Sequence, residues 1–204
     1  MRKVAGQSIS LPAPELDGAS TLERSLDQRR SIRTFEDGPL GLSDLGQLLW
    51  AAQGVTDRRG YRTAPSAGAL YPLEVFAVVA SVEALRPGVY RYDPREHALR
   101  MTASGDWRRQ LQAAALDQSA VGSAPAVLVI TGVYARTAAK YGSRAQRYVH
   151  MEAGHASQNV YLQSTALGLA TVLIGAFDDR RVQEVLELPS DHEPLGLMPV
   201  GRGR

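Results

Sequence analysis

A stretch of small residues that runs directly into an apolar run, residues 62–73, constrains the fold of this chain more than any other feature. It reads Arg-Thr-Ala-Pro-Ser-Ala-Gly-Ala-Leu-Tyr-Pro-Leu, and apart from Glu74 the residues stay apolar to Ala80. Small side chains let backbone amides approach a ligand closely, and a short apolar run is typical of a buried strand. The sequence therefore predicts a binding loop followed by a strand over residues 73–80.

Upstream, Arg29, Ser31 and Arg33 alternate along the segment Arg-Arg-Ser-Ile-Arg, which also contains Arg30. Alternate residues of an extended chain project to one face, so two guanidinium groups and a hydroxyl converge on one point. That set suits a dianionic phosphate. Each segment alone also fits a solvated helix end or an ordinary Gly/Pro turn, but the two segments in this order favour a phosphate site.

The remaining pattern alternates between helices and strands. Ser20 to Glu23 form a capping-box pattern that opens one helix, and Ser43 opens a second, which Gly54 ends. We expect helices over residues 20–28, 43–54, 106–117, 148–169 and 178–188. We expect strands over 73–80, 126–133, 171–176 and 195–200, with a small hairpin formed by 89–92 and 98–101.

The segments from Arg29 to Phe35 and from Pro65 to Pro72 resemble the FMN-dependent nitroreductase superfamily, and specifically its SagB-type branch. That branch contains dehydrogenases that oxidise azoline rings in ribosomally made peptides. The resemblance departs at Ala69, where the SagB-type loop would carry a second glycine. It spans roughly residues 11 to 201, and further matches follow in the family's order: Gln118 with 124–127, then 140–142, 152–159, 174–177 and 199–201.

The resemblance implies an α+β fold of the nitroreductase type over residues 1–204, taken as one FMN-binding domain. A central, mostly antiparallel mixed sheet would be flanked by helices in an intertwined homodimer. FMN would be held by residues from several segments: Arg29, Arg30, Ser31, Arg33, Gln118, the backbone of Ile174, Gly175 and Ala176, and the loop Pro65, Ser66, Ala67 and Gly68 of the partner chain. Arg202 and Arg204 could close on the phosphate, although they equally fit a frayed terminal tail.

Lys140 and Tyr141 are the candidate catalytic pair. The chain has 21 arginines and only two lysines, Lys3 and Lys140, so a retained lysine indicates a need for an amine. Arginine keeps its proton at accessible pH, whereas a lysine amine beside a phenol can exchange one. Composition alone also allows an exposed lysine kept by chance, but Lys140-Tyr141-Gly142 resembles the SagB-type catalytic motif.

We therefore expect an FMN-dependent oxidoreductase that oxidises azoline-like rings to azoles in modified-peptide biosynthesis. Its substrate would be a small molecule or a modified peptide, and a cyclodehydratase would be a partner. Two alternatives stay open. One is an NAD(P)H-dependent nitro or quinone reductase, and the other is a flavin-binding scaffold subunit of a biosynthetic complex.

Composition excludes several other classes of protein. The chain has no cysteine, so disulfides, thiolate catalysis and cysteine-ligated metals are excluded. Its net charge of +2 comes with arginines scattered along the chain, which argues against nucleic-acid binding. The helix face carrying Glu152, His155, Gln158 and Asn159 is expected to be a polar seam of a dimer interface and not a metal site.

The apolar stretches are too short for a membrane protein. The longest, residues 124–135, is interrupted by Pro125 and Gly132 and falls short of the ~20 residues that span a bilayer. The first residues include Arg2 and Lys3 but continue with polar residues instead of an apolar signal core. We therefore expect no membrane helix and a cytoplasmic protein.

Overall fold

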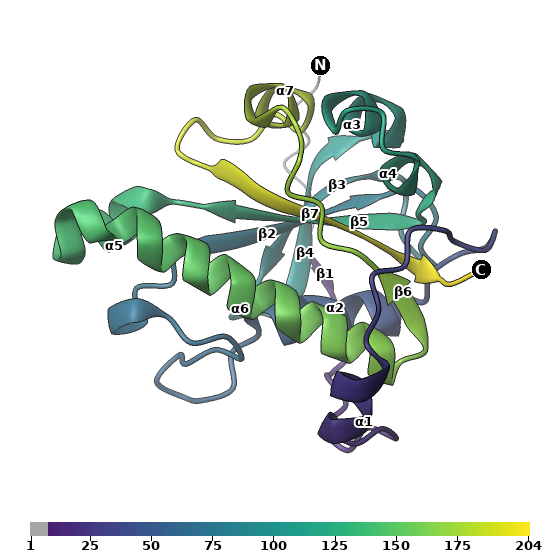
Figure 1. The fold of residues 1–204 in the computed structure, drawn as a ribbon, viewed down its shortest axis with the longest axis horizontal. Helices are drawn as coiled ribbons and strands as arrows, with labels where there is room; N and C mark the ends of the chain where they lie inside the picture. Colours follow the sequence, from purple (N-terminus) through teal and green to yellow (C-terminus); the bar gives the residue numbers. More distant parts are fainter. Residues whose placement is uncertain (1–7) are drawn as a thin grey trace.

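The computed structural model describes residues 8–204, and a seven-stranded sheet lies at its centre (Figure 1). The strand order is β1-β4-β3-β2-β5-β7-β6, and every pair of neighbouring strands is antiparallel. Among the described residues, parallel pairing is limited to an isolated bridge between Leu40 and Val82. The bounds are β1 Ser8–Ser10, β2 Leu73–Val79, β3 Gly88–Asp93, β4 Ala98–Ser104, β5 Ala126–Gly132, β6 Leu169–Thr171 and β7 Glu193–Arg202.

The central strands β2 and β5 are buried along their whole length, as their continuous apolar runs predict. Successive side chains of a strand point to opposite faces, and the two hydrophobic clusters follow this rule. Val75 and Ala77 pack on one face of the sheet, whereas Phe76 and Val78 pack on the other. Both faces must therefore be covered by helices.

One face is covered by α2 (Leu42–Gln53) and the long α6 (Ala145–Ala166), with α1 (Leu22–Gln28) packed against α6. The other face is covered by α3 (Arg108–Ala114), α4 (Ser119–Ser123) and α7 (Asp179–Val185). Figure 1 shows α6 lying across the sheet, with α3 and α7 apart from it. The expected α+β fold with helices on both faces of a central antiparallel sheet is confirmed.

Most predicted elements differ by a few residues from their bounds in the structure, and two of these differences have a clear physical cause. The long helix begins three residues before Tyr148 and ends at Ala166, because Gly168 has a left-handed φ of 68° that a helix cannot continue through. The bounds predicted for the strand over 171–176 are wrong, because β6 covers Leu169–Thr171 and Ile174 then makes only an isolated bridge to Leu197.

Three elements lack sequence signals and were not predicted: β1, α4 and α5 (Tyr134–Tyr141). The residue before α5 is Val133, which makes no side-chain cap. Without a capping residue, nothing in the local sequence marks the start of this helix. This matters because α5 carries the Lys140-Tyr141 pair.

The predicted caps shift by one or two positions. Thr21, and not Ser20, caps α1, since its hydroxyl accepts a hydrogen bond from the Arg24 amide at 3.2 Å. The N-cap of α2 is Gly41, and not Ser43. Gly54 ends α2 as predicted.

Residues 8–204 contain neither a membrane-spanning helix nor a group of side chains suited to a metal ion. Within this range no helix is long and apolar enough to cross a bilayer. Within the same range, no three His, Asp or Glu side chains are grouped so that they could hold a metal ion.

Candidate functional site

Lys140 and Tyr141 meet the small-residue loop at Gly68. A methyl group added to Gly68 would lie 2.9 Å from the Tyr141 hydroxyl and 3.1 Å from Lys140 Nζ. Gly68 also has a left-handed φ of 63°, so both its conformation and its surroundings require glycine. The Lys140 ammonium lies 5.4 Å from the centre of the Tyr141 ring. The structure therefore brings the predicted catalytic pair and the predicted loop together.

The loop is held in a tight turn by its own backbone and side chains. The Ser66 hydroxyl accepts a hydrogen bond from the Tyr71 amide at 2.8 Å. Ala69 has a φ of 54°, which is the left-handed conformation that glycine favours. The departure from the family pattern at Ala69 therefore falls on a strained position, at a cost of about 1–2 kcal/mol.

Glu152 of α6 anchors this loop, a role that no local signal in the sequence predicts. Its side chain is 4% exposed, and its Oε1 accepts a hydrogen bond from the Ala67 amide at 2.9 Å. Burial raises the pKa of the Glu152 carboxyl, while the Ala67 amide acts in the opposite direction. A nearly buried carboxyl group thus fixes the backbone of the loop.

We expect Glu152→Ala to lower the free energy of unfolding by about 1–3 kcal/mol, because the Ala67 amide loses its acceptor. Glu152→Gln keeps an acceptor oxygen and removes the cost of a buried charge. Folding raises the pKa of the Glu152 carboxyl. The cost of burying the charge is therefore absent below the pKa of the unfolded state and fully present above the pKa of the folded state. The Gln variant should be at least as stable as the parent at pH 7, and the difference should vanish in acid. Urea unfolding of both variants checks this, and equal destabilisation would contradict it.

Tyr161 of α6 joins the predicted phosphate segment to the chain after β6. Its hydroxyl lies 3.0 Å from Ser31 Oγ and accepts a hydrogen bond from the Leu173 amide at 2.7 Å. The Arg29 guanidinium lies over its ring, 5.0 Å from the centre. Sequence reasoning missed Tyr161, since a tyrosine on a long helix carries no local signal of such contacts.

The other predicted arginines divide into two groups. Arg30 turns back on the carboxyl end of α1, where its guanidinium donates to the Asp27 and Arg29 carbonyls at 2.7 and 2.8 Å. Arg33 stays beside Ser31, with Nη1 3.5 Å from the Ser31 carbonyl. The structure therefore separates the Arg30 side chain from the set formed by Arg29 and Ser31.

The terminal residues lie beside the same segment. The Arg204 amide donates to the Thr34 carbonyl at 3.2 Å, and the Arg202 carbonyl accepts from the Glu36 amide at 2.9 Å. The tail is thus paired and not frayed. Arg202 and Arg204 lie next to the chain that carries Arg33, and Arg204 reaches Asp37 at 3.8 Å.

Gln118 and the segment 174–176 also meet. The side-chain Nε2 of Gln118 donates to the Ala176 carbonyl at 2.7 Å and to the Ala115 carbonyl at 3.0 Å. The Ile174 amide is already used, because it donates to the Leu197 carbonyl at 2.8 Å. The exposed Gly175 and Ala176 are therefore the members of this segment that can face a ligand.

A hollow of about 450 Å³ lies beside Gly175, between α6 and β7. The α6 residues that line it follow one helix face, and Tyr161 is one turn beyond the last of them. Gly154 and Gly175 present open space, since a methyl group added to either would touch nothing within 4 Å. The lining includes Gln146, His150, Ala153, Gly154 and Ser157 of α6, Leu173 and Gly175, and Glu193 to Gly196 of β7.

The small-residue loop lies on a different face of α6. Glu152 contacts Ala67, and a second pocket is lined by Pro65 to Ala67 together with Tyr148, Met151, Glu152 and His155. On a helix with 100° per residue, these α6 positions point away from those that line the hollow. In Figure 1 the loop before β2 and the strand β7 lie on opposite sides of α6. A single chain therefore places the predicted loop and Gly175 on separate sides of one helix.

Comparison with known proteins gives consistent similarities over nearly the whole chain. A model described as the nitroreductase family matches residues 26–202. A candidate nitroreductase from Methanocaldococcus jannaschii is 45% identical over 197 residues, which cover 97% of this chain and 98% of that protein. The crystal structure of a candidate nitroreductase from Ralstonia eutropha aligns with a TM-score of 0.85 and 30% identity, covering 98% of this chain and 91% of that one.

A second similarity is to microcin proteins of Escherichia coli. The microcin B17-processing protein McbC is 32% identical over 138 residues, which cover 64% of this chain and 49% of McbC. A chain of the microcin synthetase McbBCD complex, solved with truncated pro-MccB17 bound, aligns with a TM-score of 0.74 and 25% identity. That alignment covers 95% of this chain and 77% of the other.

Proposed function

This chain belongs to the nitroreductase family of oxidoreductases, and from that premise we propose that it is an FMN-dependent dehydrogenase of the SagB type, which oxidises azoline-like rings to azoles. What supports the finer assignment is the meeting of Lys140 and Tyr141 at Gly68. The similarity to McbC and to the McbBCD complex agrees with it. By the same similarity, a cyclodehydratase is the proposed partner and a modified peptide the proposed substrate.

The residues fit FMN, whose phosphate and flat ring need different surroundings. Arg29, Ser31 and Arg33 would hold the phosphate end beside Tyr161, with Arg202 and Arg204 on the adjacent tail. Gly175 and Ala176 would face the ring in the hollow, where Gly154 leaves open space. When bound, FMN supplies the acceptor for a hydride, and the protein provides position and charge.

Lys140 is the proposed general base. Conversion of an azoline to an azole removes a proton from one ring carbon and a hydride from its neighbour, and the electron pair left behind forms the new ring double bond. Lys140 Nζ takes the proton, while the Tyr141 hydroxyl orients the amine and the substrate. Gly68 has no side chain, which leaves space beside Lys140 Nζ and the Tyr141 hydroxyl. A substrate ring could approach these two groups there.

The active form is a homodimer in this proposal. The predicted loop and Lys140 lie on one side of α6, and Gly175 lies on the other, so one chain does not assemble both halves of the site. Two chains that pack through α6 would place the loop of one beside the hollow of the other. Light scattering should give twice the chain mass of 22.0 kDa for the flavin-loaded protein. A flavin-loaded monomer would contradict the shared site.

The experiment that tests the direction of the reaction is anaerobic mixing of the flavin-loaded protein with an azoline-containing peptide. We expect the absorbance of the oxidised flavin to be lost on the timescale of one turnover. A peptide that already carries azoles should leave this absorbance unchanged. The similarity to the M. jannaschii protein favours a second candidate, an NAD(P)H-driven nitro or quinone reductase. Bleaching by NADPH but not by the azoline peptide would assign that function instead.

A further inference from the structure

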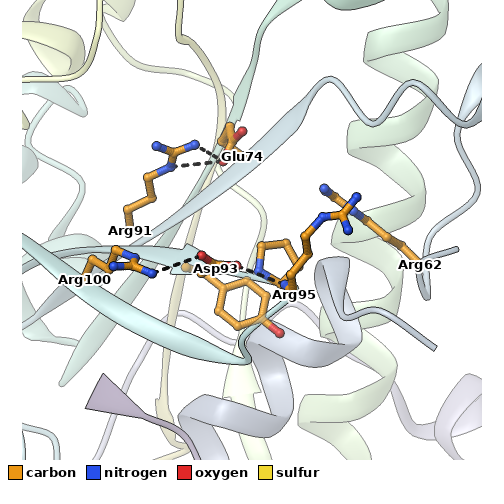
Figure 2. Close-up of a pocket in the computed structure, with 8 residues that line it drawn as sticks. Arg62, Glu74, Arg91, Asp93, Arg95 and Arg100 are labelled. Atoms are coloured by element: carbon orange, nitrogen blue, oxygen red, sulfur yellow. Dashed lines mark hydrogen bonds and ion pairs between the residues drawn. The ribbon is translucent and has the colours of Figure 1, made fainter. Parts of the chain in front are cut away.

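A basic cavity opens beside the turn between β3 and β4, away from the residues assigned to FMN (Figure 2). Its volume is about 210 Å³. Four arginines and two carboxylates line it, so two positive charges remain uncompensated. The lining comprises Arg62, Glu74, Arg91, Tyr92, Asp93, Pro94, Arg95 and Arg100.

Both carboxylates already have partners. Glu74 is held between Arg91 at 3.0 Å and Arg136 at 2.6 Å. Asp93 lies 3.6 Å from Arg100, which also pairs with Glu96 at 2.5 Å, and Asp93 accepts a hydrogen bond from the Arg95 backbone amide at 3.0 Å. The acidic groups of the cavity are thus occupied by other arginines.

Arg62 and Arg95 are the two cations left over. Neither makes an ion pair with a carboxylate anywhere in the part of the chain that the structure describes. Both side chains line the cavity, and their guanidinium groups overlap in the view of Figure 2. Two guanidinium groups that line one small cavity repel each other, and a bound anion would offset that repulsion.

Arg62 is also held in place. Its Nη1 donates to Gln53 Oε1 at 2.8 Å, and its guanidinium lies 4.6 Å from the centre of the Tyr71 ring. Gln53 is only 3% exposed, so the support is rigid. A preorganised guanidinium gives up little side-chain entropy when it binds a ligand.

From this geometry we propose that Arg62 and Arg95 bind an oxyanion, the phosphate or carboxylate group of a small substrate or cosubstrate. The planar fork of arginine pairs with two oxygens at once, and the net charge of the cavity matches a dianion. The site lies at the base of the segment 62–73, whose tip carries Gly68. The inference holds whatever the flavin site oxidises.

This cavity and the proposed FMN phosphate site are distinct. Arg91 of β3 is in register with Phe76, Val129 and Leu197 across the sheet. Arg202 lies five residues further along β7 than Leu197. Three strand spacings and five residues of rise separate the two arginines by roughly 20 Å. One phosphate cannot reach both groups.

The test is calorimetric titration of the FMN-loaded protein with inorganic phosphate and, separately, with succinate, at constant ionic strength. We expect phosphate to bind, and Arg95→Gln to weaken binding at least about tenfold because one charge-assisted pair is lost. Arg62→Gln should act in the same direction. Arg58→Gln removes the same charge from an exposed position outside the cavity and should change nothing.

The outcomes separate the sources of the oxyanion. Tighter binding of phosphate, lost in Arg95→Gln, supports a phosphate ligand, and the same pattern with succinate supports a carboxylate. Flavin content measured on every variant should stay at the parent level, which keeps this result independent of the FMN site. Equal phosphate and succinate binding by Arg95→Gln and the parent, or no binding of either anion at millimolar concentration, overturns the proposal. Because Arg95 is exposed, its variant should fold even if Arg62→Gln does not.

Discussion

Replacing Arg29 and Arg33 together with Ala should release FMN from the protein. Each arginine is assigned one charge-assisted contact to the phosphate, worth about 1.5–3 kcal/mol. Losing both should weaken FMN binding by roughly two to four orders of magnitude. The measurement is flavin absorbance after gel filtration, followed by titration of the flavin-free protein with FMN and with riboflavin, which lacks the phosphate. The double variant should bind the two flavins about equally.

The matched control is Arg180→Ala with Arg181→Ala. Both side chains are exposed on α7, so the control removes the same charge without touching the proposed site. It should retain FMN like the parent. If the Arg29 and Arg33 double variant kept FMN at unchanged affinity, the phosphate would have to be bound elsewhere, and the assignment to Arg29, Ser31 and Arg33 would be wrong.

Lys140→Arg should retain FMN and slow the reduction of the flavin by an azoline peptide by about two to four orders of magnitude, the usual range for a general base. Arginine keeps the positive charge but does not give up its proton at working pH. The change therefore removes proton transfer and little else. Stopped-flow absorbance under anaerobic conditions measures the rate, and flavin content measured beforehand excludes loss of the cofactor.

The other lysine provides the control for this experiment. Lys3 lies outside the described residues. In the Lys3→Arg variant, the azoline peptide should reduce the flavin at the parent rate. If Lys140→Arg were as fast as the parent, another group would be the base. If Lys140→Ala left a peptide-modifying pathway intact in cells, the chain would act there as a flavin-binding scaffold and not as the catalyst.

Sequence reasoning was most successful where the signal is local. The continuous apolar runs of β2 and β5 predicted strands that are buried along their length, and Gly54 marked the end of α2. The loop at Gly68 follows from the same kind of signal, since a glycine flanked by small side chains favours a tight turn, and Gly68 indeed has a left-handed φ. These features depend on neighbours within a few residues, and a single sequence contains that information.

Local signals failed where several helix boundaries were equally compatible with the pattern. α5 begins without a capping side chain, and α6 begins at Ala145, three residues before the predicted start, also without one. The strand expected over 171–176 stops early because Ile174 pairs with Leu197 of β7 instead. In each case, packing against a distant element decided the outcome, and propensity did not.

The sequence by itself determined which segments belong to the candidate site: an alternating Arg-Ser-Arg segment, a small-residue loop and a Lys-Tyr pair. Only the tertiary structure decided which of these segments contact each other. Ser31 reaches Tyr161 across 130 positions of the chain, and Ala67 reaches Glu152 across 85. Such contacts depend on strand order and on which face of α6 each residue occupies, because long-range pairing is set by the packing of the whole sheet. Periodicity records the face of a residue within its own element, but it does not record which element that face will meet.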